Sequence, residues 1–344
     1  MEKLLDILKS MPPYATLLKR AVARESAAVA GIGQISRSHI IAGLRHHQSA
    51  PMVVVVQDDM AARRLQEELK AFLNETAPIL PSRELTLYDT AVVSRGWEQK
   101  RLRLFYELAR GNCPILIATW EALNMRTIPK SCLFSAALQL RREAQISMEE
   151  VCERLVANGY SRGTLVEGVG QFSLRGGILD VFTPSYEHPI RLEFFGDEID
   201  RITEIDVLTG SIIDEIGHVA IYPASHYVVA PETMNRATHA IEEELEERVR
   251  FFKSEDKLLE AQRIAERTNF DIEMMRETGF CSGIENYSRH LTGLKAGEPP
   301  HTLIDYFPDD FLLFVDESHV TLPQCRAMYA GDRSRKDALV NYGF

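Results

Sequence analysis

The strongest constraint on the fold is the apolar run Met52–Val56, in which four valines follow one another before the polar stop Gln57-Asp58-Asp59. A continuous β-branched run of this length is typical of a strand buried on both faces of a parallel sheet. The pattern recurs over residues 114–119, and helical spacing over 60–73 and 97–108 lies between the two runs. Strands that alternate with helices predict βαβ units and therefore an α/β layer.

A third apolar run, over residues 310–317, ends in two carboxylates and predicts another buried strand that rejoins this layer. Between the runs the pattern changes to short strand-like segments, and Ile190–Phe194 alternates apolar and charged residues as half-buried antiparallel strands do. We therefore predict a small α+β domain over 130–228, inserted between 1–129 and 229–344. The last part includes a charged helical segment, 232–278, with a break near 253–255.

Composition narrows the class of protein. The formal net charge is −11, from 39 Lys and Arg against 50 Asp and Glu, so a surface dedicated to coating DNA is not expected. The five cysteines form no CxxC pair, which fits a reducing cytoplasm, and His46-His47 lack ligand spacing, so we expect no metal site. The N-terminus has no apolar run of signal-peptide length, and 52–56 is too short to span a membrane. We expect a soluble cytoplasmic protein.

The segment Gly31–Ser38, GIGQISRS, is the best match to a phosphate loop, G-x-x-x-x-G-K-[ST]. Ser36 stands where the second glycine leaves room for the phosphates, and Arg37 stands where a lysine supplies a compact charge. Only Ser38 keeps the type of residue that could meet a magnesium ion. We interpret the segment as a relic of a phosphate loop that shapes a helix start.

Asp316 and Glu317 end the expected strand 310–317 and are the second half of this degenerate nucleotide pocket. Carboxylates at a strand end can hold magnesium and activate water for phosphoanhydride cleavage. Without a competent phosphate loop they have no obvious substrate.

Arg162 and Arg175 flank the glycine-rich segment 168–174. Arginines near a junction of loop and strand are good anchors for carboxylates on a partner surface. The alternative is that both are ordinary solvated arginines.

These stretches together resemble two related families. From about residue 197 to its end the chain resembles UvrB, the excinuclease subunit of bacterial nucleotide excision repair. The matching stretches are GDEIDRITEIDVLTG (196–210), HVAIYPASHYV (218–228), the segment 258–293, TLIDYFPDDFLLFVDESHVTLPQ (302–324) and MYAGDRSRKDALVNYGF (328–344). The first half resembles the N-terminal UvrB-like module of the transcription-repair coupling factor, Mfd. Its matching stretches are WEQKRLRLFYELARG (97–111), ILIATWEALNMRTIP (115–129) and VEGVGQFSLRGGILDVFTP (166–184), and the resemblance changes within 185–215.

The resemblance implies a degenerate RecA-like (P-loop NTPase-like) parallel-sheet domain with an inserted small α+β UvrA-interaction domain. In both families this domain docks onto UvrA through arginines, and Arg162 and Arg175 match two of the positions. A third position, an arginine in UvrB, is Ser173 here. The chain also departs from UvrB. Its phosphate loop is broken, the interval 80–99 has only Tyr88 where UvrB carries a tyrosine-rich damage-probing hairpin, and a second motor domain would follow Phe344.

We therefore predict a UvrA-binding module that is not an active enzyme, holds no cofactor and contacts DNA only indirectly or weakly. The alternative is an ATP-dependent damage-verification subunit of the UvrB type. A third interpretation is a fragment that needs the missing motor domain to fold.

Overall fold

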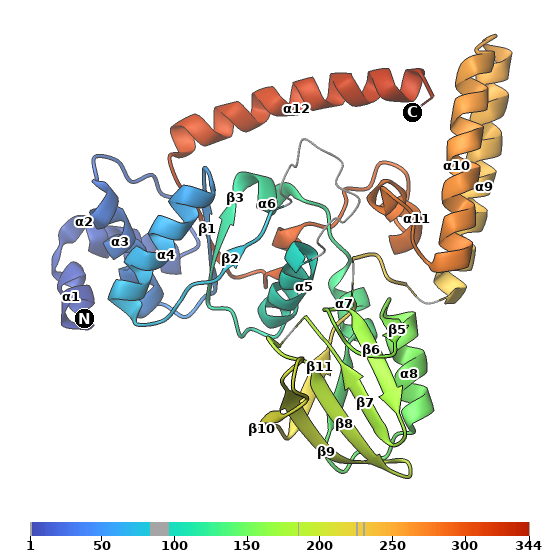
Figure 1. Ribbon diagram of the computed structural model, residues 1–344. Coiled ribbons are helices and arrows are strands. Elements are labelled where there is room, and N and C mark those ends of the chain that lie inside the picture. The colour runs from blue at the N-terminus through green and yellow to red at the C-terminus, as the bar shows by residue number, and fades with distance from the viewer. Residues whose placement is uncertain (1, 83–95, 185, 225, 230, 344) are drawn as a thin grey trace. The chain divides into compact units, whose positions relative to one another are not determined.

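The computed structural model describes residues 2–82, 96–184, 186–224, 226–229 and 231–343 (Figure 1). They fall into two compact units, the first from 1–90, 104–125 and 302–326, the second from 91–103, 126–301 and 327–344. The first unit is thus built from separated stretches of chain, as expected for a domain that carries an insertion. Tyr88 and most of the 80–99 interval lie outside the described residues.

The first unit is an α/β domain with a parallel sheet, ordered β12-β1-β3-β2. Its elements are α1 (Glu2–Ile7), η1 (Leu8–Ser10), α2 (Pro12–Val22), α3 (Gln34–His47), β1 (Met52–Val56), α4 (Asp59–Leu73), β2 (Ile79–Leu80), β3 (Ile115–Thr119), α6 (Trp120–Asn124), η3 (Leu303–Tyr306) and β12 (Leu312–Val315). Two helices run from one unit into the other, α5 (Gly96–Ala109) and α12 (Ser318–Asn341).

The centre of this sheet follows the sequence prediction. Every residue of β1 and β3 is buried, and the two strands pair in parallel with Val54 opposite Ile117. β12 also rejoins the sheet in parallel, with Phe314 opposite Val54. The expectation that this third strand is buried is wrong, because β12 is the edge strand and its Leu313 side chain is half exposed.

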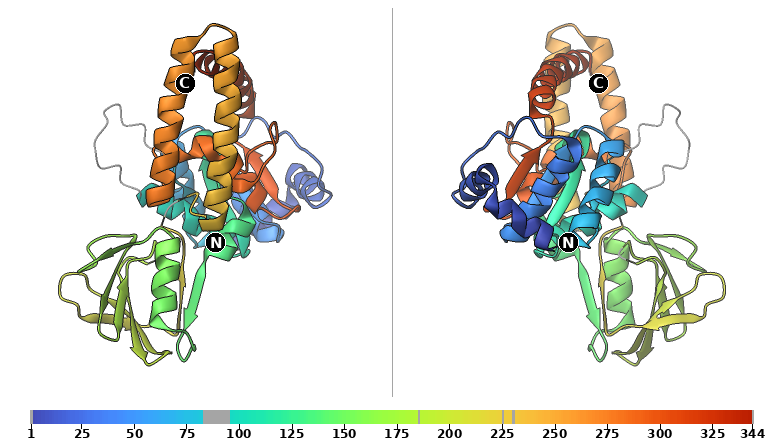
Figure 2. Two further views of the ribbon diagram at one scale, coloured as in Figure 1. Left: turned by 90° about the vertical axis from the view of Figure 1, so that its right-hand side faces the viewer. Right: turned by 90° about the vertical axis from the view of Figure 1, so that its left-hand side faces the viewer.

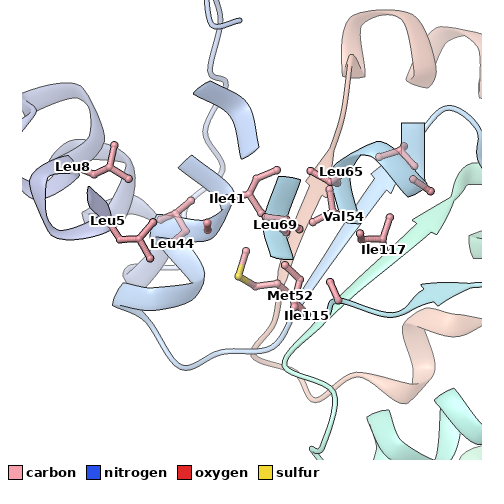
Figure 3. Packing of buried hydrophobic residues seen from close by; sticks show 14 of the residues in the cluster. Leu5, Leu8, Ile41, Leu44, Met52, Val54, Leu65, Leu69, Ile115 and Ile117 are labelled. Carbon is pink, nitrogen blue, oxygen red and sulfur yellow. The ribbon is translucent and has the colours of Figure 1, made fainter. Parts of the chain in front are cut away.

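Helices α3 and α4 cover the sheet with apolar side chains at helical spacing (Figure 3). Ile41 and Leu44 of α3 join Leu65 and Leu69 of α4 around Val54. The sequence sets the ends of α4, since the Asp58 carboxylate caps its start by accepting from Ala61 N at 2.8 Å, and Asn74 ends it in the left-handed conformation. This core fixes the position of the strand ends.

The second unit contains an α+β part and a helical part. Its elements are α7 (Lys130–Ala136), β4 (Leu138–Arg141), α8 (Met148–Ala157), β5 (Ser161–Gly163), β6 (Gln171–Arg175), β7 (Ile178–Val181), β8 (Ile190–Phe195), β9 (Glu198–Ile205), β10 (Ile212–Glu215), β11 (His218–Ile221), α9 (Pro231–Ser254), α10 (Leu258–Thr278), η2 (Ile284–Tyr287) and α11 (Ser288–Thr292). The predicted mixed architecture, a parallel-sheet domain with an inserted α+β domain, is confirmed.

The inserted domain is built on a sheet ordered β10-β9-β8-β7-β6-β5, antiparallel except for the parallel pair of β5 with β6. One face of this sheet, which we call the inner face, lies against α8 and the two-stranded ribbon of β4 and β11 (Figure 2). Phe172, Leu179 and Leu192 pack on this face. The opposite, outer face carries polar side chains, as the alternation in β8 requires.

The charged segment predicted as helical forms the antiparallel hairpin of α9 and α10 (Figure 2), and its break at residues 255–257 lies two residues beyond the predicted one at 253–255. Arg276 of α10 donates to Glu242 of α9 at 2.8 Å, which joins the two helices across the hairpin. Within the described part of the chain, every helix is too short or too polar to cross a membrane.

Candidate functional site

The degenerate phosphate loop is partly helical. Gly33 caps α3, which begins at Gln34, so that Ser36 and Arg37 lie in its first turn. The Arg37 backbone N–H already donates to Gly33 O at 3.0 Å, and is therefore no longer free to donate to a phosphate. Gly31 keeps the left-handed conformation, with φ +74°, that its residue type allows.

Arg37 binds the carboxylates at the end of β12. Its Nη1 lies 2.5 Å from Asp316 Oδ1 and 3.8 Å from Glu317 Oε1. Asp316 is held in place because its backbone N–H donates to Val55 O of β1 at 2.8 Å. The structure thus brings together the two halves of the predicted pocket, but the guanidinium of this chain neutralises the carboxylate that would hold a metal ion.

Ser38 is also engaged within the fold. Its side chain is fully buried, and its Oγ donates to the Glu68 carboxylate of α4. The same carboxylate accepts from Gln34 Nε2 at 3.1 Å. The Ser38 hydroxyl, which in an intact phosphate loop could bind a magnesium ion, therefore links α3 to α4 in this chain.

Arg162 lies on β5, the edge strand of the inserted sheet, and all three residues of β5 are exposed. Its register partner is Phe172, whose side chain is buried in the inner face, so Arg162 is placed on that face beside α8. The pKa of the Cys152 thiol on α8 supports this placement. Burial raises that pKa, and the Arg162 charge partly opposes the effect.

Arg175 ends β6 on the outer face. Its Nη2 donates to Asp180 Oδ2 at 3.0 Å, while half of its side chain stays exposed. The Asp180 side chain is only 4% exposed and also accepts from Arg191 Nε at 2.7 Å and Nη2 at 2.9 Å. Two guanidinium groups thus share one carboxylate, and the Glu193 carboxylate of β8 also acts electrostatically on Arg191.

The two predicted arginines therefore flank the same edge from opposite faces, because Arg175 is three residues beyond Phe172 in β6. Ser173, the third matched position, is 1% exposed, and its register partner is Asp180. Sequence reasoning missed Asp180 and Arg191. Their signal is a pair of opposite charges at matching positions of neighbouring strands, which is visible only once the register is known.

Comparison with known proteins matches two parts of the second unit. Residues 138–227 match the UvrB interaction domain, and residues 232–293 match the UvrB third helical domain. Proteins called UvrABC system protein B are similar over most of the chain. The one from Agathobacter rectalis is 43% identical over 92% of this chain and 50% of its own length. The one from Carboxydothermus hydrogenoformans is 56% identical over 91% of this chain and 50% of its own length. The one from Clostridium beijerinckii is 59% identical over 60% of this chain and 32% of its own length.

The chain combines a parallel-sheet α/β domain, consistent with a RecA-like fold, with an inserted α+β domain and a helical hairpin, and the phosphate loop of that fold is altered in this chain. Two of its domains match UvrB domains, and the chain is similar over most of its length to proteins called UvrABC system protein B, which is consistent with a UvrB-homology module. It spans about half the length of the curated relatives it matches. The resemblance of residues 97–184 to Mfd stays a prediction.

Proposed function

We propose that this module recruits UvrA through the β5–β6 edge of its inserted domain and hydrolyses no ATP itself. The observation that carries the proposal is the arrangement of two exposed guanidinium groups, Arg162 and Arg175, on either face of one edge. The match of residues 138–227 to the UvrB interaction domain supports UvrA as the partner.

The charge balance favours an acidic partner. Asp180 is already satisfied by Arg191, so Arg175 can exchange its contact for a partner carboxylate at little cost to the fold. Within the described part of the chain, Arg162 forms no ion pair with a carboxylate, and it lies on an exposed strand. A partner that covers the edge places acidic groups against both faces. Loss of either charge-paired arginine then costs about 2 kcal/mol of binding free energy.

The test is a calorimetric titration of the chain with purified UvrA. We expect Arg162→Glu/Arg175→Glu to abolish binding, because both charges are reversed at the edge. Arg154→Glu is the matched control, since Arg154 is an exposed arginine of the same domain on α8. Binding that the double variant keeps would contradict the assigned edge. A folded wild-type chain that fails to bind UvrA would contradict the function.

The absence of ATP hydrolysis is proposed on the contacts of Arg37 and Ser38 described above. A nucleotide would have to displace Arg37 from Asp316 and Ser38 from Glu68 before a magnesium ion could bind. We expect no saturable, magnesium-dependent ATP binding by the chain in a fluorescent-nucleotide titration. Saturable binding would favour instead an ATP-dependent damage-verification role of the UvrB type.

A further inference from the structure

A cluster of ligand-type side chains lies in the first unit, at the opposite end of α3 from the degenerate phosphate loop. Asp6 comes from α1, and His46 and His47 come from the last turn of α3. One potential ligand atom from each of the three residues lies within 4.8 Å of the other two. The sequence hides this cluster, because adjacent histidines lack ligand spacing and their partner is 40 residues earlier in the chain.

The distances suit one small ion. Asp6 Oδ1 lies 3.6 Å from His46 Nε2 and 3.3 Å from His47 Nε2. A tetrahedral zinc ion with bonds of about 2.0–2.1 Å keeps its ligand atoms about 3.4 Å apart. The two distances from Asp6 are therefore already near the separations that a shared ion requires, and the two histidine nitrogens lie within 4.8 Å of each other.

A fourth residue orients one of the ligands. The Tyr14 hydroxyl lies 2.7 Å from His47 Nδ1, on the far side of the ring from Asp6. When Nδ1 donates its proton to Tyr14 Oη, the lone pair of Nε2 faces the cluster, as metal binding requires. Gly43 allows this approach, because a Cβ there would lie 2.9 Å from Tyr14 Oη.

One residue of the cluster is buried and the other two are exposed to solvent, as in a metal site that keeps one coordination position open to water. The His47 side chain is 1% exposed and fixed by its neighbours, whereas Asp6 is 59% exposed and His46 is partly exposed. Water can therefore reach the fourth coordination position. Lys9 is near enough to act on His47 electrostatically, and its charge opposes a cation at this position.

We propose that Asp6, His46 and His47 bind one divalent transition-metal ion, with Tyr14 as the positioning residue behind His47. Two imidazoles and one carboxylate suit zinc, whereas magnesium and calcium prefer oxygen ligands throughout. The ion would join α1 to the end of α3, so it would stabilise the N-terminal helices of the first unit. This site is independent of the proposed UvrA interface.

The test is a zinc titration of the full chain by calorimetry after treatment with a chelator. We expect one zinc ion to bind, and Asp6→Asn and His46→Ala each to weaken its binding at least tenfold. His239→Ala is the matched control, because His239 is an exposed histidine of α9 beside carboxylates. Circular dichroism checks that the variants fold, which the exposure of Asp6 and His46 favours.

Two further measurements make the assignment specific. Tyr14→Phe keeps all three ligands and is expected to weaken zinc binding about tenfold, the effect typical of a lost outer-shell hydrogen bond. Cobalt in place of zinc is expected to show no sulfur-to-metal charge-transfer band, because none of the five cysteines belongs to the cluster. A thiolate band, or zinc binding unchanged in Asp6→Asn and His46→Ala, would overturn the site.

Discussion

At the edge of the inserted sheet, the positions of single side chains decide what Arg162 and Arg175 can do. Arg175 shares Asp180 with Arg191 on the outer face, whereas Arg162 lies on the inner face beside Cys152. The two guanidinium groups are separated by the sheet itself. A partner must therefore meet them with different acidic residues.

We predict that the effects of Arg162→Ala and Arg175→Ala on UvrA binding are additive. Side chains without shared partners normally give additive changes, within about 0.5 kcal/mol. A double-mutant cycle by calorimetry, with wild type, both single variants and the double variant, measures the coupling energy. A coupling well above 0.5 kcal/mol would mean that both arginines reach the same acidic group of the partner.

Asp180 is predicted to matter for folding more than for recognition. Asp180→Ala leaves the Arg191 guanidinium, mostly buried, without its carboxylate, which costs about 3 kcal/mol of unfolding free energy. Arg175→Ala removes only the exposed contact to the same carboxylate, and we expect a loss below about 1 kcal/mol. Urea unfolding of both variants measures the difference. Equal losses of unfolding free energy in the two variants would contradict the larger role assigned to the contact between Asp180 and Arg191.

At the scale of elements, the position of a strand in its sheet decides how much its side chains contribute to stability. β1 is central and fully buried, whereas β12 is at the edge.

We predict that Val54→Ala lowers the free energy of unfolding by about 2 kcal/mol, through lost burial and a cavity. Leu313→Ala, at a half-exposed position, is expected to cost less than about 1 kcal/mol although it removes more atoms. Urea unfolding measures the free energy of unfolding of each variant, and the two values are compared provided that the variants have the same m-value. Losses in the reverse order would contradict the assigned strand order.

The same contrast shows what the sequence could predict. The continuous apolar runs around Val54 and Ile117 indicated strands, and the break in the helical segment indicated the α9–α10 hairpin. Local patterns carry that information. Strand order and cross-strand register are set by tertiary packing, so the exposure of Leu313 and the pairing of Asp180 with Arg191 were not predictable from one sequence.

The candidate site was predictable to the same limited extent. The loss of the second glycine and the lysine was visible in Ser36 and Arg37. The contacts that replace the nucleotide come from residues distant in sequence, since Arg37 meets Asp316 and Ser38 meets Glu68. Adjacent histidines gave no metal signal for the same reason, because Asp6 completes their cluster from another helix.

At the scale of the whole molecule, buried bases set how stability depends on pH. In the second unit, His226 stacks near Trp97, and its backbone N–H donates to the Glu98 carboxylate at 2.6 Å. Burial lowers the pKa of His226 from 6.5 to about 3, and the neighbouring Arg101 charge acts in the same direction. Burial also lowers the pKa of Arg101, to about 10. Because both pKa values are lower in the folded chain than in the unfolded chain, protonation of either side chain lowers the free energy of unfolding.

The sign of the effect follows from these values. Well above pH 6.5 His226 is neutral in both states and imposes no penalty on folding. Between pH 6.5 and about 3 the unfolded chain binds a proton that the folded chain does not, so the free energy of unfolding falls by about 1.4 kcal/mol per pH unit. We predict a loss of about 2.3 kcal/mol from this residue alone between pH 6.5 and 4.5. Urea unfolding of wild type and His226→Phe across that range measures it, and the variant is expected to lose correspondingly less. Carboxylates contribute equally to both proteins, so the difference between their two slopes of unfolding free energy against pH gives the contribution of His226 alone. Parallel slopes would show that His226 takes up its proton within the folded chain.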